Sequence, residues 1–473
     1  MLTTFYTIYI ISFIWAAFNI LLYGNRPARS VGWLLIIFSL PIAGVILYIV
    51  FGINRKKFKF FRLNFNAKRR LYDFKDIVHN IDEDEHPFSK KKYARMNDLL
   101  KQSSDFPALE GNEVVLLKEG KQTFDTIFNA LEKAENFIHM QYYIVENGEL
   151  LTRMLDIFER KIAEGVEIRI LYDAFGSYGL KRKRLKQLKK IGAHVFPILP
   201  LKFNTILSTL NYRNHRKILI IDGTLAFTGG VNISDKYISA DSILGKWSDT
   251  HIQLKGLVID HLHRIFIKDY YFASNDTLHA TEKYLPKQAE TGNTLVQIIS
   301  GGPDHRNLSI LHQYLAMIGV AERSIYIENP YFIPNKALLE AIKMAALQGI
   351  DVRIMVPKES DSHLAKYSMF SNFQELLRTG VKIYTLNSFS HSKLMIVDKE
   401  IATIGSGNFD YRSFEHNYET NTLIYDAEIA EELSNDFESE LDHCESLDYE
   451  EFKKRSLKTK LLEGAARIFS PLL

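Results

Sequence analysis

The sequence predicts an α/β protein whose two similar halves pack with pseudo-twofold symmetry, preceded by an N-terminal transmembrane helical hairpin. Three observations lead to this fold class. The first 54 residues are dominated by apolar side chains, strand and helix patterns alternate from about residue 111, and the same order of patterns returns later in the chain. The 473 residues suffice for several well-buried units. We therefore expect a hairpin over 1–54, a juxtamembrane segment and linker over 55–110, and two halves over 111–290 and 291–473.

The hairpin is predicted from two uncharged runs. No side chain in 1–23 or in 30–54 is charged, and each run as a helix is long enough to cross a hydrocarbon core of about 30 Å. A cleaved signal peptide is the alternative for the first run, but a basic n-region is absent and a second apolar run follows closely. Pro41 and Gly44 leave a kinked or re-entrant second helix open.

Basic residues predict the orientation of this hairpin. The connecting loop carries Arg26 and Arg29. The exit from the second run is richer in cations: Arg55, Lys56, Lys57, Lys59, Arg62, Lys68, Arg69 and Arg70. The positive-inside rule then places the exit and the rest of the chain in the cytoplasm. Cys444 is the single cysteine, which excludes an intramolecular disulfide and suits a reducing compartment.

The first half begins with regular alternation. We expect strands over 113–120, 136–145, 166–173 and 193–199, with helices over 121–135 and 148–165. In the second half, 324–333, 349–357 and 380–386 repeat the second, third and fourth of these strands. A polar stretch puts the boundary near residue 290. The first half also carries an apolar insertion at 197–214, for which a core-packing loop and a membrane-dipping entrance both remain open.

One constellation of polar residues occurs in both halves. Each histidine is followed by lysine two positions on, aspartate seven on, glycine fourteen on and asparagine seventeen on. The two sets are His215, Lys217, Asp222, Gly229 and Asn232, and His391, Lys393, Asp398, Gly405 and Asn408. The apolar residues between lysine and aspartate indicate a buried strand, so histidine and lysine should project to the same side.

Packing of the halves about a twofold axis would bring both sets into one pocket. Lysine ammonium groups and asparagine amides can bind the oxygens of a phosphodiester without a metal. A histidine with a pKa near 6.5 can serve as nucleophile or as general acid, and this chemistry needs one of each. The structural alternative is a pair of buried, hydrogen-bonded histidines, which lysine, a poor core residue, argues against.

These motifs resemble those of the phospholipase D superfamily over about 110–473, and the whole chain is similar to bacterial cardiolipin synthases. Further resemblance lies in "RPARSVGW", "YRNHRK", "WSDTH", "SGGPD", "ENPYFIP" and "FDYRSFEHNYE", with "GGVN" and "GSGN" after the histidines. Ser392 stands where alanine is frequent in the family. The resemblance implies phospholipase D-type halves in a bacterial cell membrane protein. It also implies a reaction that joins two phosphatidylglycerols into cardiolipin and releases glycerol, with no cofactor or metal.

The resemblance also implies residue roles. His215 would attack phosphorus and form a phosphatidyl-histidine, while His391 protonates the departing glycerol and then activates the second lipid. The implied catalytic set is His215, Lys217, Asp222, His391, Lys393 and Asp398. Asn232, Asn408 and Ser406 are the implied phosphate-binding residues.

Each histidine needs an acceptor that orients its other ring nitrogen. Asp249 is our candidate for His215, and Glu419 is our candidate for His391, because each follows its motif at a similar place. Asp222 and Asp398 end strands, so we expect structural hydrogen bonds or ion pairs there despite their place in the motif.

Several alternatives remain open at this point. Water in place of the second lipid would give a phospholipase D, and DNA in the same site would give a nuclease. The net charge of +3 and the absence of a recognisable nucleic-acid module disfavour a nucleic-acid partner. A non-catalytic membrane scaffold would not need both motifs. The basic run 181–190 could be a solvated helix face or a contact with anionic membrane, and 461–473 is expected to be a packed helix. The sequence leaves other donor and acceptor lipids and the oligomeric state undetermined.

Overall fold

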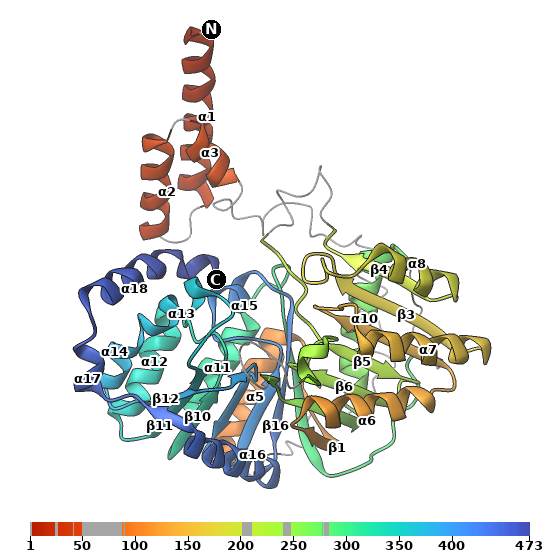
Figure 1. Cartoon of the computed structure of the whole chain (residues 1–473). Helices are drawn as coiled ribbons and strands as arrows, with labels where there is room; N and C mark the ends of the chain where they lie inside the picture. Colours follow the sequence, from red (N-terminus) through yellow and green to blue (C-terminus); the bar gives the residue numbers. More distant parts are fainter. Residues whose placement is uncertain are drawn as a thin grey trace.

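A single mixed sheet runs through both halves of the protein (Figure 1). The computed structural model describes residues 2–23, 27–40, 42–49, 88, 90–200, 211–239, 247–276, 278 and 283–473. Its fifteen-stranded sheet has the order β17-β12-β11-β10-β14-β15-β16-β9-β1-β8-β6-β5-β2-β3-β4.

The first half supplies seven strands of this sheet. They are β1 (Ala108–Leu117), β2 (Phe137–Tyr142), β3 (Glu167–Asp173), β4 (His194–Ile198), β5 (Ile218–Ile221), β6 (Leu225–Gly229) and β8 (His251–Gly256). Its helices are α6 (Gly120–Glu132), α7 (Glu149–Ala163), α8 (Arg182–Lys190) and α10 (Ile259–Ser274). The expected alternation of strands and helices is confirmed here.

The second half repeats this arrangement. Its strands are β9 (Thr294–Gly301), β10 (Ser324–Glu328), β11 (Asp351–Pro357), β12 (Lys382–Leu386), β14 (Leu394–Val397), β15 (Ile401–Gly405), β16 (Glu419–Tyr425) and β17 (Cys444–Ser446). Its helices are α11 (Ser309–Val320), α12 (Lys336–Leu347), α13 (His363–Phe370), α14 (Phe373–Arg378), α15 (Tyr411–Glu415), α16 (Ala427–Glu440), α17 (Tyr449–Lys453) and α18 (Leu457–Phe469). The sheet orders β1-β8-β6-β5-β2-β3-β4 and β9-β16-β15-β14-β10-β11-β12 correspond strand for strand, as the sequence repeat predicts.

The halves are joined through the sheet itself. β1 pairs antiparallel with β9, and Leu109 lies opposite Val296. On one face, α10 and α16 complete a hydrophobic core that draws residues from both halves, including Phe266 and Phe437. The other face has a separate core for each half, under α6, α7 and α8 in the first and under α11 to α14 in the second. A continuous sheet therefore fixes one half against the other.

Helix α5 (Lys91–Ser104) lies inside the segment expected to be a linker. Its Tyr93, Met96 and Leu100 are buried in the core of the second half, together with Tyr314 of α11. An amphipathic helix of this kind gains its stability from packing its apolar face, so the chain contributes to the second half before it enters the first.

The glycine fourteen residues after each motif histidine permits a close approach of neighbouring strands. Gly229 has φ +138°, and a Cβ there would lie 2.7 Å from the Cα of His251. A Cβ at Gly405 would lie 2.5 Å from the Cα of Asn421. Because real side chains do not fit at these distances, the glycines allow the strand that follows each motif to lie against its neighbour.

The two motif aspartates hold turns. Asp222 follows β5 with φ 52°, and its carboxylate accepts the backbone N–H groups of residues 135, 136 and 137 at 2.7–2.8 Å. Asp398 follows β14 with φ 57° and accepts those of residues 322, 323 and 324 at 2.7–3.1 Å. Aspartate tolerates this backbone region better than most residues. The structural role is confirmed, and including these two residues in the catalytic set is wrong, since their carboxylates are committed to the loops that lead into β2 and β10.

The apolar N-terminal segment forms three helices, α1 (Leu2–Tyr23), α2 (Pro27–Ser39) and α3 (Ala43–Leu47). They pack through Ile20, Ile37 and Val45. The second apolar run is therefore split into two helices. Among the described residues, none of the helices meets both the length and the apolarity that a membrane crossing requires. The basic exit at 55–70 and positions 201–210 of the insertion lie outside the described residues.

We predict that Asp222→Ala and Asp398→Ala each lower the free energy of unfolding by about 2–4 kcal/mol, because three backbone N–H groups lose their acceptor. Urea unfolding of the purified chain measures this. Asp276→Ala, which removes an exposed carboxylate, is the matched control and should stay within about 0.5 kcal/mol of the parent. Equal stability of all three variants would contradict the turn-holding role.

Candidate active site between the two halves

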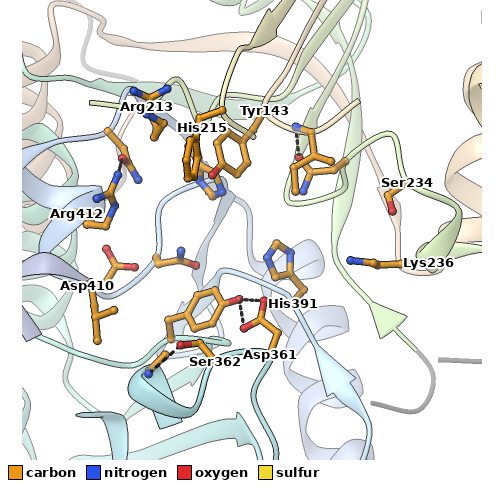
Figure 2. Close-up of a pocket in the computed structure, with 18 of the residues that line it drawn as sticks. Tyr143, Arg213, His215, Ser234, Lys236, Asp361, Ser362, His391, Asp410 and Arg412 are labelled. Carbon is orange, nitrogen blue, oxygen red and sulfur yellow. Dashed lines mark hydrogen bonds between the residues drawn. The ribbon is translucent and has the colours of Figure 1, made fainter. Parts of the chain in front are cut away.

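A cavity of about 530 Å³ lies where the two halves meet, and both motif histidines line it (Figure 2). Its wall also includes Asn232 and Asn408. One histidine and one asparagine come from each half, and the aromatic side chains are Tyr143, Phe175, Tyr237 and Trp247 of the first half and Tyr331 of the second. The convergence expected from the sequence repeat is therefore confirmed for the imidazoles and the carboxamides.

His215 lies just before β5, which holds it through a fully buried apolar run. Its Nδ1 is 3.0 Å from Oε2 of Glu419 and 2.9 Å from the backbone oxygen of Ser406. Both neighbours are hydrogen-bond acceptors, so Nδ1 carries the proton and Nε2 of the neutral ring keeps its lone pair. The ring of Tyr143 meets the imidazole edge to face at 4.7 Å. His215 is thus oriented as a nucleophile or base.

His391 lies just before β14 in the equivalent position. Its Nδ1 is 2.7 Å from Oδ2 of Asp249 and 3.3 Å from the hydroxyl of Tyr237. Nζ of Lys393 also lies 2.8 Å from this nitrogen, which gives His391 a cationic neighbour that Nδ1 of His215 does not have in the described structure. The two histidines share a backbone plan but have different electrostatic surroundings.

The pairing of histidines with carboxylates is the reverse of the sequence-based expectation. Glu419 of the second half orients His215, and Asp249 of the first half orients His391. The expectation that each carboxylate serves its own half is wrong. The reason is the packing: the backbone N–H of His215 donates to the carbonyl of Tyr418, just before Glu419, and the backbone N–H of His391 donates to the carbonyl of Ser248, just before Asp249. Each motif therefore lies beside the carboxylate-bearing segment of the other half.

Burial and neighbouring charges set the protonation of this cluster. Burial lowers the pKa of His215, and Glu419 opposes this effect. Burial lowers the pKa of His391 well below its usual value, and Lys393 and Lys217 reinforce the shift. Burial raises the pKa of Asp249 to about 6 against the influence of both lysines. Burial would also raise the pKa of Glu419, but His215, Lys217 and a hydrogen bond from Ser406 bring it below its usual value.

The motif lysines are buried next to the residues that line the cavity. Nζ of Lys217 donates to the backbone oxygen of His215 at 2.8 Å, and Nζ of Lys393 donates to that of His391. Burial and the charge of Lys393 lower the pKa of Lys217 to about 7, and burial lowers that of Lys393 to about 8. Two desolvated cations that repel each other would gain from an anion in the adjacent cavity.

The three residues expected to bind phosphate differ in their contacts and in their place relative to the cavity. Asn232 lines the cavity, and its Oδ1 accepts from the N–H of Ile144 at 3.2 Å. Asn408 lines it too, and its buried Oδ1 has no hydrogen-bond partner. The hydroxyl of Ser406, by contrast, donates to Glu419 at 2.5 Å and is absent from the cavity wall. This contact makes Ser406 a positioning residue for the carboxylate and gives no support to its predicted phosphate-binding role.

Sequence reasoning missed several cations of the cavity. Arg213, Lys236 and Arg412 line it. Arg213 stands two residues before His215, so the alternation that links His215 to Lys217 could have identified it. Lys236 and Arg412 each stand four residues after the motif asparagine of their half, so the repeat could have identified them as an equivalent pair of cations. The described residues offer no group of three or more histidine, cysteine, aspartate or glutamate side chains suited to a metal.

The aromatic residues noted in the sequence divide between the core and the cavity. Tyr143 and Tyr331 line the cavity, whereas Tyr142 is buried in the core of the first half. The hydroxyl of Tyr331 donates to Asp361 at 2.8 Å, and Asp361 also lines the cavity (Figure 2). The cavity wall combines these cations and aromatic rings with the carboxylates of Glu146, Asp361 and Asp410. The cations and rings suit a phosphate group attached to an organic chain.

Comparisons with family models and with known proteins agree with one another. A family model described as "Cardiolipin synthase, PLD-like domain" matches residues 127–245 and 314–441, and one described as "Phospholipase_D-nuclease N-terminal" matches 11–52. The chain is 38% identical over 468 residues to "Cardiolipin synthase" of a Geobacillus species, which covers 98% of this chain and 92% of that protein. It is 36% identical over 469 residues to a "Probable cardiolipin synthase" of Bacillus subtilis, with coverage of 98% and 93%.

Among solved structures, the phosphatidylserine synthase of Haemophilus influenzae superposes with a TM-score of 0.62 at 13% identity. The match covers 80% of this chain and all of that one, and it supports the two-halved fold.

We predict that Glu419→Gln lowers the pKa of His215 further, because the carboxylate that stabilises the imidazolium is gone. Asp249→Asn should lower the pKa of His391 and leave His215 near its parent value. NMR titration with histidine-selective isotope labels measures both. A response of His391 to Glu419→Gln together with an unchanged His215 would contradict the crossed pairing.

Proposed function

Because this chain belongs to the family of PLD-like cardiolipin synthases, we propose that the paired-histidine cavity transfers a phosphatidyl group through a phosphohistidine intermediate. The chain is a phosphatidyltransferase of the cardiolipin synthase type. Its reaction converts two phosphatidylglycerol molecules into cardiolipin and glycerol. The observation that carries the mechanism is the pair of imidazoles facing one cavity, each with Nδ1 held by a buried carboxylate.

In the first step, Nε2 of His215 attacks phosphorus of one phosphatidylglycerol. The P–N bond forms, the P–O bond to the headgroup glycerol breaks, and His391 transfers its proton to the departing oxygen. Glu419 stabilises the positive charge that develops on the phosphorylated imidazole. His391 must carry a proton at this stage. The neighbouring lysine cations lower the pKa of His391, and the negative charge of a bound phosphate opposes that effect.

In the second step, neutral His391 accepts the proton of a headgroup hydroxyl on a second phosphatidylglycerol. That oxygen attacks phosphorus, the P–N bond breaks, and His215 returns to its neutral form. His391 is then protonated again, so atoms and charge balance over the cycle. Lys217, Lys393, Asn232 and Asn408 are the groups nearest to the histidines that can stabilise the phosphate oxygens.

The division of labour between the histidines follows from their neighbours. Among the described residues, the hydrogen-bond partners of Nδ1 of His215 are acceptors, which preserves the lone pair on Nε2. Nδ1 of His391 contacts the acceptor Asp249 and the donor Lys393. This second arrangement favours proton exchange, because the balance between the carboxylate and the ammonium group can shift as the proton leaves and returns.

We further propose that α1 to α3 attach the protein to the bacterial cell membrane as a hairpin, with the catalytic region in the cytoplasm. The support is the absence of charged residues from 2–23, together with exposed Ile11, Ile14 and Leu21 on α1. Large apolar side chains exposed in such numbers need an apolar surrounding. A membrane-anchored catalytic region meets lipid headgroups at high effective concentration.

Purified protein supplied with phosphatidylglycerol in detergent micelles and a chelator should release glycerol and form cardiolipin in equal amounts. Mass spectrometry of the lipids and an enzymatic glycerol assay measure this. Phosphatidic acid as the main product would instead identify a phospholipase D, and restoration of turnover by added divalent metal would contradict the metal-free chemistry.

His215→Ala should abolish turnover and covalent labelling, because the nucleophile is lost. His391→Ala should slow turnover by about 10²–10⁴-fold, because it removes the general acid and base. With phosphatidylglycerol labelled in its phosphate, His391→Ala should still give some phosphoenzyme, detectable after rapid acid-free denaturation. Thermal melting of both variants checks that the fold is retained. Labelling that persists in His215→Ala would assign the nucleophile elsewhere.

A further inference from the structure

The terminal helix α18 exposes an apolar face that nothing in the described structure covers. Leu457, Leu461 and Ile468 recur at spacings that place them on one side of the helix, and they are 73%, 65% and 76% exposed. Glu463 and Ala466 on the other side are buried. An exposed amphipathic helix of this kind is typical of an interaction surface.

This helix leads directly to the mouth of the cavity. α18 packs against α13, and the chain then ends at Leu473, which lines the cavity beside Arg412. The backbone N–H of Arg412 donates to the carbonyl of Leu473 at 3.1 Å. Any surface that covers the apolar face of α18 therefore lies next to the entrance for substrate.

The first half continues this surface on the other side of the cavity. Phe175 lines the cavity and is half exposed, and Tyr178 of the same loop is 87% exposed. The loop leads into α8, where the exposed cations have no acidic residue among them. These cations are Lys181, Arg182, Lys183, Lys186, Lys189 and Lys190. In Figure 1, α18 and α8 lie along the same edge of the molecule, the edge nearest to α1 and α2.

We propose that this edge is a bilayer-docking surface, in which the apolar face of α18 enters the headgroup region of an anionic membrane and α8 binds lipid phosphates. The proposal rests on the phospholipid substrate of the proposed function and specifies how that substrate reaches the cavity. The exposed leucine and isoleucine side chains of α18 and the run of positive charges on α8 lie along one edge. Together they match an anionic lipid surface, where each lysine or arginine contributes roughly 1 kcal/mol. A lipid headgroup could then pass from the bilayer into the cavity past Leu473 and Phe175.

The direct test measures the surroundings of α18 in a membrane. A fluorophore is attached at Leu461→Cys or Ile468→Cys in a Cys444→Ser background, and the full chain is reconstituted into phosphatidylglycerol vesicles. Leu347→Cys is the matched control. Leu347 is 70% exposed and precedes the start of β11, whereas the other end of β11 leads toward the cavity. We expect brominated lipid to quench the labels at 461 and 468 and to leave the label at 347 bright.

Two outcomes would overturn the docking surface. The first is equal quenching of all three labels by iodide in the aqueous phase. The second is shielding of the labels at 461 and 468 from iodide without quenching by brominated lipid, which would indicate a protein neighbour. Assaying cardiolipin in the same vesicles separates this result from the proposed function, because an active enzyme with a water-exposed α18 contradicts docking alone.

A second measurement uses turnover. The double variant Leu461→Ser/Ile468→Ser should lower turnover on vesicles roughly tenfold, because less apolar surface enters the bilayer. Turnover of a short-chain phosphatidylglycerol dispersed as monomers should be unchanged, and Leu347→Ser should affect neither substrate. An equal loss of turnover on both substrates would show that α18 supports the structure of the cavity. That result would overturn the docking role of α18.

Discussion

The crossed carboxylate–imidazole pairs are the interaction on which the site depends. Glu419 and Asp249 are almost fully buried, and a buried carboxylate is costly unless a partner compensates for its desolvation. Each finds that partner on the opposite half, His215 for Glu419 and His391 for Asp249. The cavity therefore forms only when the halves are docked. The continuous sheet through β1 and β9 and the shared core under α10 and α16 provide the rigidity that holds four charged groups in this arrangement.

Duplication of one α/β unit has given two geometrically equivalent histidines with different chemistry. The strands that carry them match one for one, and Asp222 and Asp398 hold the same turn in each half. Their surroundings differ. Lys393 reaches Nδ1 of its histidine, whereas Lys217 reaches only the backbone oxygen of its own, and Tyr237 lies near Nδ1 of His391 where His215 has the carbonyl of Ser406. The proposed transfer reaction needs one nucleophile and one proton carrier, and this local asymmetry would let a symmetric scaffold supply both.

The charge distribution follows the path of an anionic lipid. Exposed cations on α8 lie at the edge of the molecule, Arg213, Lys236 and Arg412 line the cavity, and the two motif lysines are buried below it. Net charge over the chain is only +3, and the carboxylates of Glu146, Asp361 and Asp410 also line the cavity, so the positive charge is local to these side chains and to α8. Aromatic walls and the apolar face of α18 accommodate the non-polar part of an amphiphile along the same side.

The sequence by itself determined the repeated α/β plan, the two motifs and their convergence, because strand periodicity and equal spacing are local properties that one chain displays directly. It also identified Asp249 and Glu419 as the orienting carboxylates. Only the tertiary structure decided which histidine each one serves, that Ser406 positions Glu419, that α5 packs with the second half, and that Lys236 and Arg412 line the cavity. These features depend on contacts between strands and loops far apart in the chain, and the repeat gives no information on which copy contacts which. The docking of one half on the other makes that choice, since it places each motif against the carboxylate-bearing segment of the opposite half.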